Sequence, residues 1–260
     1  MSKHLKLVSF AYLPIYSEES TLNWQDVSTT FKMKKDFTAE DFEYYIIASS
    51  LFSSKIEGNS LDFNTFYRNR KSKSKEIQEI ENLADAYKFA SKNPLTEKNF
   101  LTIHATLSQT FLQKKEQGKY RKSQIGVFDS NTGRPAYMAV EPEFVKEEMK
   151  KLFGDIKILF ARKLSYKETF YCASMIHIWL AKIHPFADGN GRSARLLEKW
   201  FLSEKLGELA WAINSEKYYW DNRQKYYENI ALGFNYYVLF WERCTSFLQM
   251  LPEAVKNSVF

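Results

Sequence analysis

Hydrophobic side chains recur at helical spacing along most of the chain. In segment 38–57, the apolar positions Phe42, Ile46 and Ile56 recur at intervals that place them on one face of a helix. Thr38 stands where a helix N-terminal cap is expected, with a carboxylate three residues later, and a glycine follows the last apolar position. The pattern therefore predicts a helix over 38–57.

The remaining periodic segments predict further helices and one β-hairpin. Helical spacing covers 76–90, 96–111, 143–160, 166–182, 191–205, 215–232 and 236–251. Segments 124–128 and 134–140 flank the turn-like residues 129–133, a pattern typical of a hairpin, and Pro135 suits only an edge strand. Because one hairpin is too small to form a sheet core, we expect an all-α, mostly helical fold with the hairpin as an appendage.

Composition narrows the class of protein further. The chain has 260 residues, of which 45% are hydrophobic and only 9 are glycine and 6 proline, which excludes extensive disorder and disfavours a turn-rich sandwich or barrel. The two cysteines cannot form a disulfide framework, so we expect a cytoplasmic, reducing location. The apolar stretch 7–16 lacks a cleavage site for a signal peptide, and the apolar run 230–241 is too short to span a membrane.

The charge of the chain identifies no partner. The formal net charge is +6 and is spread along the sequence, which points only weakly to anionic partners. A basic cluster lies at 68–75, between two predicted helices, and is expected to be a solvated loop. We therefore expect neither nucleic-acid nor membrane binding.

The segment 184–195 reads His-Pro-Phe-Ala-Asp-Gly-Asn-Gly-Arg-Ser-Ala-Arg and carries the clearest chemistry. Its glycines predict a tight loop that leads into a helix, whose free N–H groups and dipole attract an anion. Arg192 and Arg195 share the first turn of that helix and suit an oligophosphate. Asp188 is an oxygen ligand for Mg²⁺, and His184 can accept a proton near neutral pH. This combination suggests a nucleotide-dependent transfer.

These twelve residues match the motif of the Fic family, His-x-Phe-x-Asp/Glu-Gly-Asn-Gly-Arg-x-x-Arg, at every specified position. The flanking segment 118–121, His177 and the pair Tyr226–Tyr227 are also similar to the family, so the resemblance covers about 76–232. It implies the Fic fold, with the hairpin as a flap beside the active site. It also implies transfer of AMP from ATP to a Ser, Thr or Tyr hydroxyl of a target protein, with Mg²⁺.

The resemblance assigns a role to each motif residue. His184 would deprotonate the target hydroxyl, Asp188 would hold Mg²⁺ and Phe186 would be structural. The phosphates of ATP would be bound by Gly189, Asn190, Gly191, Arg192 and Arg195, with Arg195 on the γ-phosphate. This logic matches other phosphoryl-transfer sites, where positioning and charge do most of the catalysis.

A second motif lies far upstream, at 53–58. Ser53-Ser54-Lys55-Ile56-Glu57-Gly58 matches the family's inhibitory pattern, Ser/Thr-x-x-x-Glu-Gly/Asn, and places Ser53 and Glu57 on one helix face. The resemblance implies that Glu57 pairs with Arg195, replaces the γ-phosphate there and inhibits the enzyme. Some relatives use the same glutamate to promote removal of AMP, so that activity stays open.

The resemblance also assigns the remaining parts of the chain. Val127 and Phe128 are the candidate flap residues near the nucleotide. Tyr226, Tyr227 and Asn235 are the candidates on the adenosine side, although Asn235 lies one residue beyond the family position. We divide the chain into an N-terminal helical region (1–75) with the inhibitory helix, a Fic core (76–235) and a C-terminal helix packed on it (236–260).

Several alternatives to AMP transfer stay open at this point. The same fold serves other nucleotide or phosphate transfers, although the kinase-like relatives carry lysine where Gly191 stands. A non-enzymatic nucleotide-binding regulator is a second alternative, which the complete motif disfavours. A DNA-binding regulator is disfavoured because the sequence leaves no room for a winged-helix domain after residue 251. The target protein is unknown, and self-modification and a homo-oligomer are both compatible with the sequence.

Overall fold

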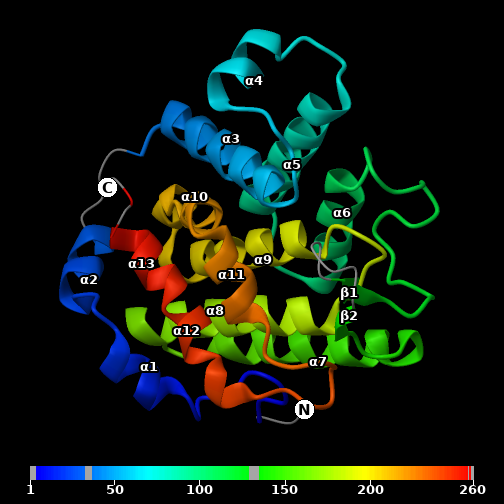
Figure 1. Cartoon of the computed structure of the whole chain (residues 1–260). Coiled ribbons are helices and arrows are strands. Elements are labelled where there is room, and N and C mark those ends of the chain that lie inside the picture. Colours follow the sequence, from blue (N-terminus) through cyan, green and yellow to red (C-terminus); the bar gives the residue numbers. More distant parts are fainter. Residues whose placement is uncertain (1–3, 33–36, 129–134, 257, 259–260) are drawn as a thin grey trace.

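A computed structural model of the chain describes residues 4–32, 37–128, 135–256 and 258 (Figure 1). Side chains are not described for Val127, Phe128 and Pro135. The helices are α1 (Leu13–Glu19), α2 (Trp24–Lys32), α3 (Ala39–Ile56), α4 (Phe63–Asn69), α5 (Lys75–Lys92), α6 (Glu97–Leu107), α7 (Pro142–Ala161), α8 (Tyr166–Ile183), α9 (Asn190–Leu206), α10 (Ser215–Asp221), α11 (Arg223–Ile230), α12 (Thr245–Leu248) and α13 (Met250–Lys256). Two short 3-10 helices, η1 (Glu208–Ala212) and η2 (Trp241–Arg243), lie among them. The predicted all-α fold is confirmed.

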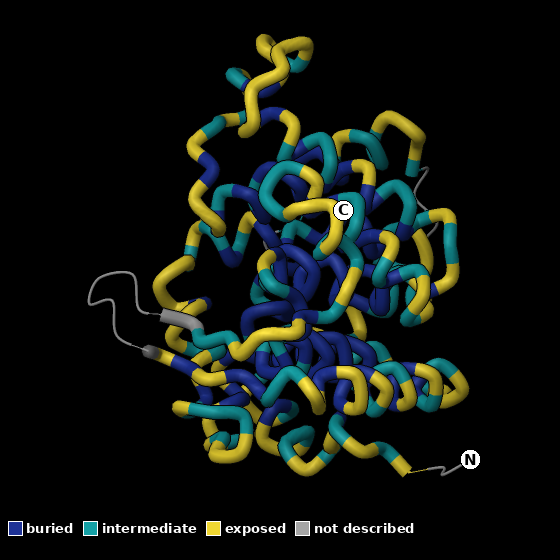
Figure 2. The backbone as a smooth tube through the Cα atoms, turned by 90° about the vertical axis from the view of Figure 1, so that its right-hand side faces the viewer, coloured by how far each residue is buried: buried dark blue, intermediate teal, exposed yellow. Residues whose placement is uncertain are grey.

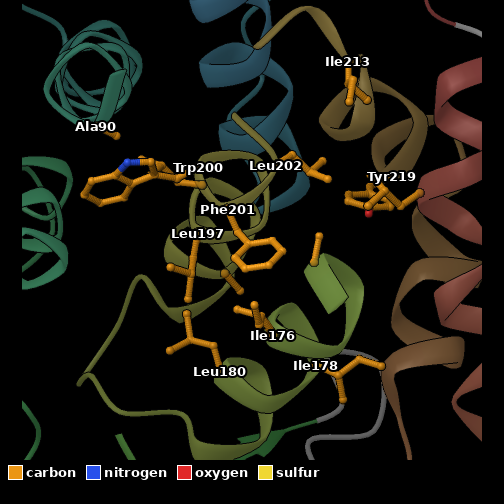
Figure 3. Close-up of a cluster of buried hydrophobic side chains, with 14 of the residues drawn as sticks. Ala90, Ile176, Ile178, Leu180, Leu197, Trp200, Phe201, Leu202, Ile213 and Tyr219 are labelled. Carbon is orange, nitrogen blue, oxygen red and sulfur yellow. The ribbon is translucent and has the colours of Figure 1, made fainter. Parts of the chain in front are cut away.

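Helices α8 and α9 form the centre of the molecule and pack along each other (Figure 1). Ile176 and Leu180 of α8 face Leu197 and Phe201 of α9, and all four side chains are fully buried (Figure 3). The buried part of the tube runs through this pair, and the outer turns are exposed (Figure 2). The loop that joins α8 to α9 is therefore anchored at both ends in the core.

Helices α3 and α5 pack on each other, and both contact α9 (Figure 1). Helix α3 begins as predicted, because Thr38 and Asp41 form a reciprocal capping box. It ends at Glu57, which has left the helical conformation and forms the C-cap. This arrangement brings the C-terminal end of α3 to the beginning of α9.

The β-hairpin is present and short. Strand β1 (Gly126–Phe128) pairs antiparallel with β2 (Pro135–Met138), and Gly126 lies opposite Met138. The predicted turn at 129–133 lies outside the described residues. On the other side of β2, Met138 N–H donates to the Phe234 carbonyl at 2.8 Å, and Tyr236 N–H donates to the Met138 carbonyl at 3.0 Å.

The prediction of one helix over 236–251 is wrong. Residues 232–240 form a loop that lies against β2, and η2, α12 and α13 follow it. Gly233 has φ +154°, and a Cβ at this position would clash with the Val238 carbonyl. Phe240 N–H donates to the Leu232 carbonyl at 2.7 Å, so residues 232–240 close a tight loop where the helix was expected to begin. The aromatic spacing that suggested a helix instead packs Trp241 on Trp179, with ring centroids 4.5 Å apart.

Other boundaries differ less. The predicted helix 215–232 is divided into α10 and α11 at Asn222, and the short helices α1, α2 and α4 were not predicted. The other predicted helices are present, although α6 ends earlier than expected. Within the described residues, no helix combines the length and the apolar composition that a membrane span requires.

Candidate active site

The loop between α8 and α9 is held in one conformation by its own side chains. Phe186 is fully buried, and its ring stacks on that of His104 with centroids 3.5 Å apart. The side-chain amide of Asn190 accepts from Phe186 N–H and donates to the Phe186 carbonyl, both at 2.9 Å. The Asn190 side chain therefore shapes the loop, and its backbone N–H belongs to the first turn of α9. Gly189 has φ +81°, which favours glycine.

His104 of α6 supports this loop, a role that the sequence did not indicate. Its Nδ1 accepts from Gly118 N–H at 3.0 Å, so its Nε2 carries the proton and donates to the Asp188 carbonyl at 3.0 Å. Burial lowers the pKa of His104 to about 4, and the charge of Arg192 adds to this effect. His104 is therefore neutral at physiological pH, as these bonds require.

His184 lies at the C-cap of α8 in a left-handed conformation. Among the described residues it is the only non-glycine residue with positive φ, at +50°. Its Nδ1 lies 3.3 Å from the Ala181 carbonyl, which favours the proton on Nδ1 and leaves Nε2 as an acceptor. Burial lowers its pKa to about 4, and Arg121 adds to this effect, whereas Glu57 and Asp188 oppose it. His184 is therefore neutral at physiological pH, the state that a general base needs.

Arg195 is fully buried, and every nitrogen of its guanidinium has a partner. Its Nε donates to Ser53 Oγ at 2.9 Å, and Nη2 donates to the Ser53 carbonyl at 3.1 Å and to Glu57 Oε1 at 2.7 Å. Its Nη1 donates to the Tyr226 hydroxyl at 3.2 Å. The structure thus brings Ser53, Glu57 and Arg195 together, although 138 residues separate the last two.

The carboxylate of Glu57 lies directly over the first turn of α9. A Cβ at Gly191 would lie 2.5 Å from Glu57 Oε1, so a side chain at this position would push the carboxylate out of its present place. Burial opposes ionisation of Glu57, but the guanidiniums of Arg195 and Arg192 hold its pKa below the usual value. Glu57 is therefore an ionised carboxylate that lies close to Gly191 in the first turn of α9 and pairs with Arg195.

Arg192 is held separately and is nearly buried, with 6% of its side chain exposed. Its Nη1 donates to Glu79 of α5 at 2.5 Å, and its Nη2 lies 3.4 Å from Asp188 Oδ1. Its guanidinium also stacks on the Phe111 ring, 3.7 Å from the centroid. Glu79 was not identified from the sequence, because nothing in its local pattern points to α9.

Asp188 is the candidate Mg²⁺ ligand, and 55% of its side chain is exposed. No group of three or more His, Cys, Asp or Glu side chains in the described residues is arranged to hold a metal. Mg²⁺ commonly binds through one or two carboxylates together with substrate phosphates. One accessible carboxylate beside an anion site therefore fits a Mg²⁺ ion that arrives with a nucleotide.

The candidates on the adenosine side separate in the structure. Tyr226 is buried, and its hydroxyl lies 3.0 Å from Nε2 of His177. The other ring nitrogen of His177, Nδ1, lies 2.9 Å from the Glu198 carboxylate. His177 is therefore a hydrogen-bonded histidine of the core. Tyr227 is exposed, and its hydroxyl donates to the Ile56 carbonyl at 3.1 Å.

Asn235 lies in the loop beside β2 instead of on a helix with the tyrosines. Its Oδ1 accepts from the N–H groups of Tyr237 and Val238, both at 3.0 Å. Val127 and Phe128 lie on β1, as predicted, but their side chains are outside the described part of the structure.

A second buried contact between α3 and α9 was missed from the sequence. Lys199 Nζ donates to Ser49 Oγ at 2.7 Å and to Glu216 at 2.5 Å, and all three side chains are buried. Ser49, Ser53 and Glu57 follow one another at intervals of four residues, as do Arg195 and Lys199. Continuing the four-residue spacing back from Ser53 would have identified Ser49 as a further residue on the face of α3 that contacts α9.

Comparisons with known proteins match a central part of the sequence. Residues 94–202 match the sequence model of the Fic/DOC family. A stretch of 82 residues is 35% identical to "Protein adenylyltransferase Fic" of Nematostella vectensis, and it covers 32% of this chain and only 17% of that relative.

Solved structures match over more of the chain. A Fic family protein from Desulfovibrio desulfuricans aligns with a TM-score of 0.76 and 20% identity, over 98% of this chain and 75% of that one. A Fic domain containing signaling protein from Bacteroides thetaiotaomicron aligns with a TM-score of 0.62 and 18% identity, over 91% and 97%. At these identities, the similarity establishes the fold. The family-model match covers residues 94–202, which include the motif 184–195, and the solved structures share the fold of this chain.

Proposed function

We propose that this chain is a protein adenylyltransferase that Glu57 holds in an inhibited state. The observation that carries the proposal is the position of Glu57. Its carboxylate pairs with the fully buried Arg195 inside an otherwise complete phosphate-binding motif. The match to a relative named protein adenylyltransferase supports the reaction type.

The geometry suggests how the chain transfers AMP. His184 Nε2 accepts the proton of a target Ser, Thr or Tyr hydroxyl, and the oxygen attacks the α-phosphorus of ATP. A new O–P bond forms, the bond between the α- and β-phosphates breaks and pyrophosphate leaves. The N–H groups at the start of α9 and the two arginines stabilise the charge on the phosphates. A Mg²⁺ ion on Asp188 would neutralise phosphate charge and orient the leaving group.

The same geometry explains inhibition. Arg195 already has four hydrogen bonds, two of them to Ser53 and one to Glu57, so a γ-phosphate must displace the carboxylate to reach it. Two anions at one guanidinium repel each other at short range. ATP that binds beside Glu57 is therefore expected to place its α-phosphate away from His184.

The experiment uses ATP labelled at the α- or the γ-phosphate. We would compare Glu57→Gly with Glu57→Gly combined with His184→Ala, as purified protein alone and in a cell lysate. We expect protein labelling from α-labelled ATP only, and none in the double variant. Label from γ-labelled ATP alone would establish phosphate transfer instead. No label at all, with ATP binding intact by calorimetry, would establish a nucleotide-binding regulator.

A further arm tests removal of AMP. The labelled product is incubated with the unsubstituted protein, in which Glu57 is intact, and release of AMP is followed. Under the proposal the label stays on the product. Rapid release that depends on Glu57 would assign the opposite reaction to this site.

A further inference from the structure

Arg121 lies between α6 and β1 and is only 5% exposed. Its Nε donates to the His184 carbonyl at 2.8 Å, and its Nη2 lies 3.4 Å from the Ile183 carbonyl. Its backbone N–H donates to the Pro185 carbonyl at 2.9 Å. Arg121 therefore contacts three consecutive residues, with His184 in the middle.

The same guanidinium holds both ends of the hairpin. Its Nη1 donates to the carbonyl of Ser123, three residues before β1, at 2.9 Å. Its Nη2 also donates to the carbonyl of Val140, two residues after β2. One side chain thus connects the two bases of the hairpin to the backbone of His184.

These contacts suit arginine in particular. All four acceptors of the side chain are backbone carbonyls, so the guanidinium keeps its full positive charge beside them. A planar fork with five N–H donors reaches several carbonyls in different directions, whereas lysine has one nitrogen. The left-handed conformation of His184 also needs surroundings that enforce it, because a non-glycine residue rarely adopts it.

We propose that Arg121 is the positioning residue for His184, which fixes the backbone of the base and couples its position to that of the hairpin. This inference rests on the proposed function, since it concerns the proton acceptor of that reaction. It concerns the catalytic step more than nucleotide binding, because Arg121 contacts neither Arg192 nor Arg195 in the contacts described above.

The positive charge of Arg121 also lowers the pKa of His184, an effect that can be measured separately from its hydrogen bonds. The charged groups that act on His184 are Arg121, which lowers its pKa, and Glu57 and Asp188, which raise it, while burial makes the largest contribution. Replacing Arg121 by a neutral residue should raise the pKa of His184. Replacing it by lysine should keep the charge and lose the geometry.

The test compares Arg121→Lys and Arg121→Met in the Glu57→Gly background. We expect both to lower kcat by about 10- to 100-fold, because a displaced base is ineffective, with the KM for ATP changed by less than about threefold. The pKa of His184 is measured by NMR of histidine-labelled protein, with His184→Ala to identify its signal. It should rise in Arg121→Met and stay nearly unchanged in Arg121→Lys.

Lys205→Met is the matched control. Lys205 also donates to backbone carbonyls, those of Leu159, Phe160 and Arg162, but it lies near the far end of α9 from the motif. Its loss should lower the thermal midpoint and leave kcat and the His184 pKa unchanged.

The results distinguish a positioning role of Arg121 from a purely structural role and from a failure of the proposed function. If the Arg121 variants only lower the thermal midpoint, as Lys205→Met does, the positioning role is overturned. If Arg121→Met does not fold, Arg121→Lys decides through its kcat and its unchanged His184 pKa. If the Glu57→Gly parent transfers nothing, the proposed function fails, while the His184 titration still tests the contact with Arg121.

Discussion

At the scale of single residues, the buried guanidinium of Arg195 is held by hydrogen bonds to partners that are distant in the sequence. Arg195 bonds to Ser53, Glu57 and Tyr226, and Tyr226 connects it to His177. Removing one member of such a network leaves another buried polar group without a partner, which costs more than the bond itself contributes.

Tyr226→Phe is predicted to destabilise the fold. The change leaves His177 Nε2 and one N–H of Arg195 without the hydroxyl, so the free energy of unfolding should fall by about 1–3 kcal/mol. Urea unfolding at pH 7 measures it. Tyr227→Phe is the control, because its hydroxyl bonds the Ile56 carbonyl from an exposed side chain. Equal losses in both variants would contradict the role of the network.

The sequence predicted the residues of the contiguous motif 184–195 and could not predict most of their partners. The motif is recognisable because its chemistry is concentrated in twelve positions. Glu79 and His104 act on it from other elements, and their local sequence contains no sign of that contact. Arg121 lies in the segment 118–121 that resembles the family, but the resemblance did not indicate its contact with His184. The pairing of Glu57 with Arg195 was predicted only through the resemblance, because geometry alone cannot align two helices so far apart in sequence.

At the scale of elements, α3 contacts α9 through one face. Ser49, Ser53 and Glu57 lie at intervals of four residues and meet Lys199 and Arg195, which have the same spacing. This face is polar, which explains why an apolar pattern identified the helix but not its partner. The prediction of one helix over 236–251 was wrong because its apolar and aromatic side chains are spaced like those of a helix but lie in a loop and three short helices.

The serines of α3 allow a sharp test of this contact. Ser53 Oγ accepts from Arg195, whereas the hydroxyl of the neighbouring, equally buried Ser54 has no hydrogen-bond partner. Ser53→Ala should loosen Arg195 from α3. It should raise AMP transfer about two- to tenfold, as expected for the loss of one hydrogen bond worth about 0.5–1.5 kcal/mol. Ser54→Ala should leave the rate unchanged. If both serine variants transfer at the rate of the unsubstituted protein, Ser53 has no part in the restraint.

At the scale of the whole molecule, the central pair α8–α9 supplies the candidate catalytic loop, and two helices before residue 93 supply carboxylates that pair with its arginines. Glu57 ends α3 and Glu79 lies on α5, so both carboxylates come from outside residues 94–202. The two arginines of the motif therefore depend on parts of the chain outside residues 94–202 for their carboxylate partners.

Stability should decrease in mild acid because His104 is buried in its neutral form. Its folded pKa is about 4, below the unfolded value, so the unfolded chain binds the proton first as pH falls. The free energy of unfolding is therefore full above about pH 6.5 and should fall by about 2 kcal/mol between pH 7 and pH 5 through this residue. Urea unfolding at both pH values measures it. In His104→Gln, the free energy of unfolding should lose about 2 kcal/mol less between pH 7 and pH 5 than in the unsubstituted protein. If the loss is the same in both proteins, His104 is not its source.

The most direct test of the account is the rate of AMP transfer from α-labelled ATP in the unsubstituted protein, Glu57→Gly and Glu40→Gly. Glu40 is an exposed glutamate in the first turn of the same helix, so it controls for the substitution itself. The account predicts that Glu57→Gly transfers AMP about 10- to 100-fold faster, as expected when an anion that competes for Arg195 is removed, and that Glu40→Gly matches the unsubstituted protein. Equal rates in all three proteins would contradict an inhibitory role for the Glu57–Arg195 contact.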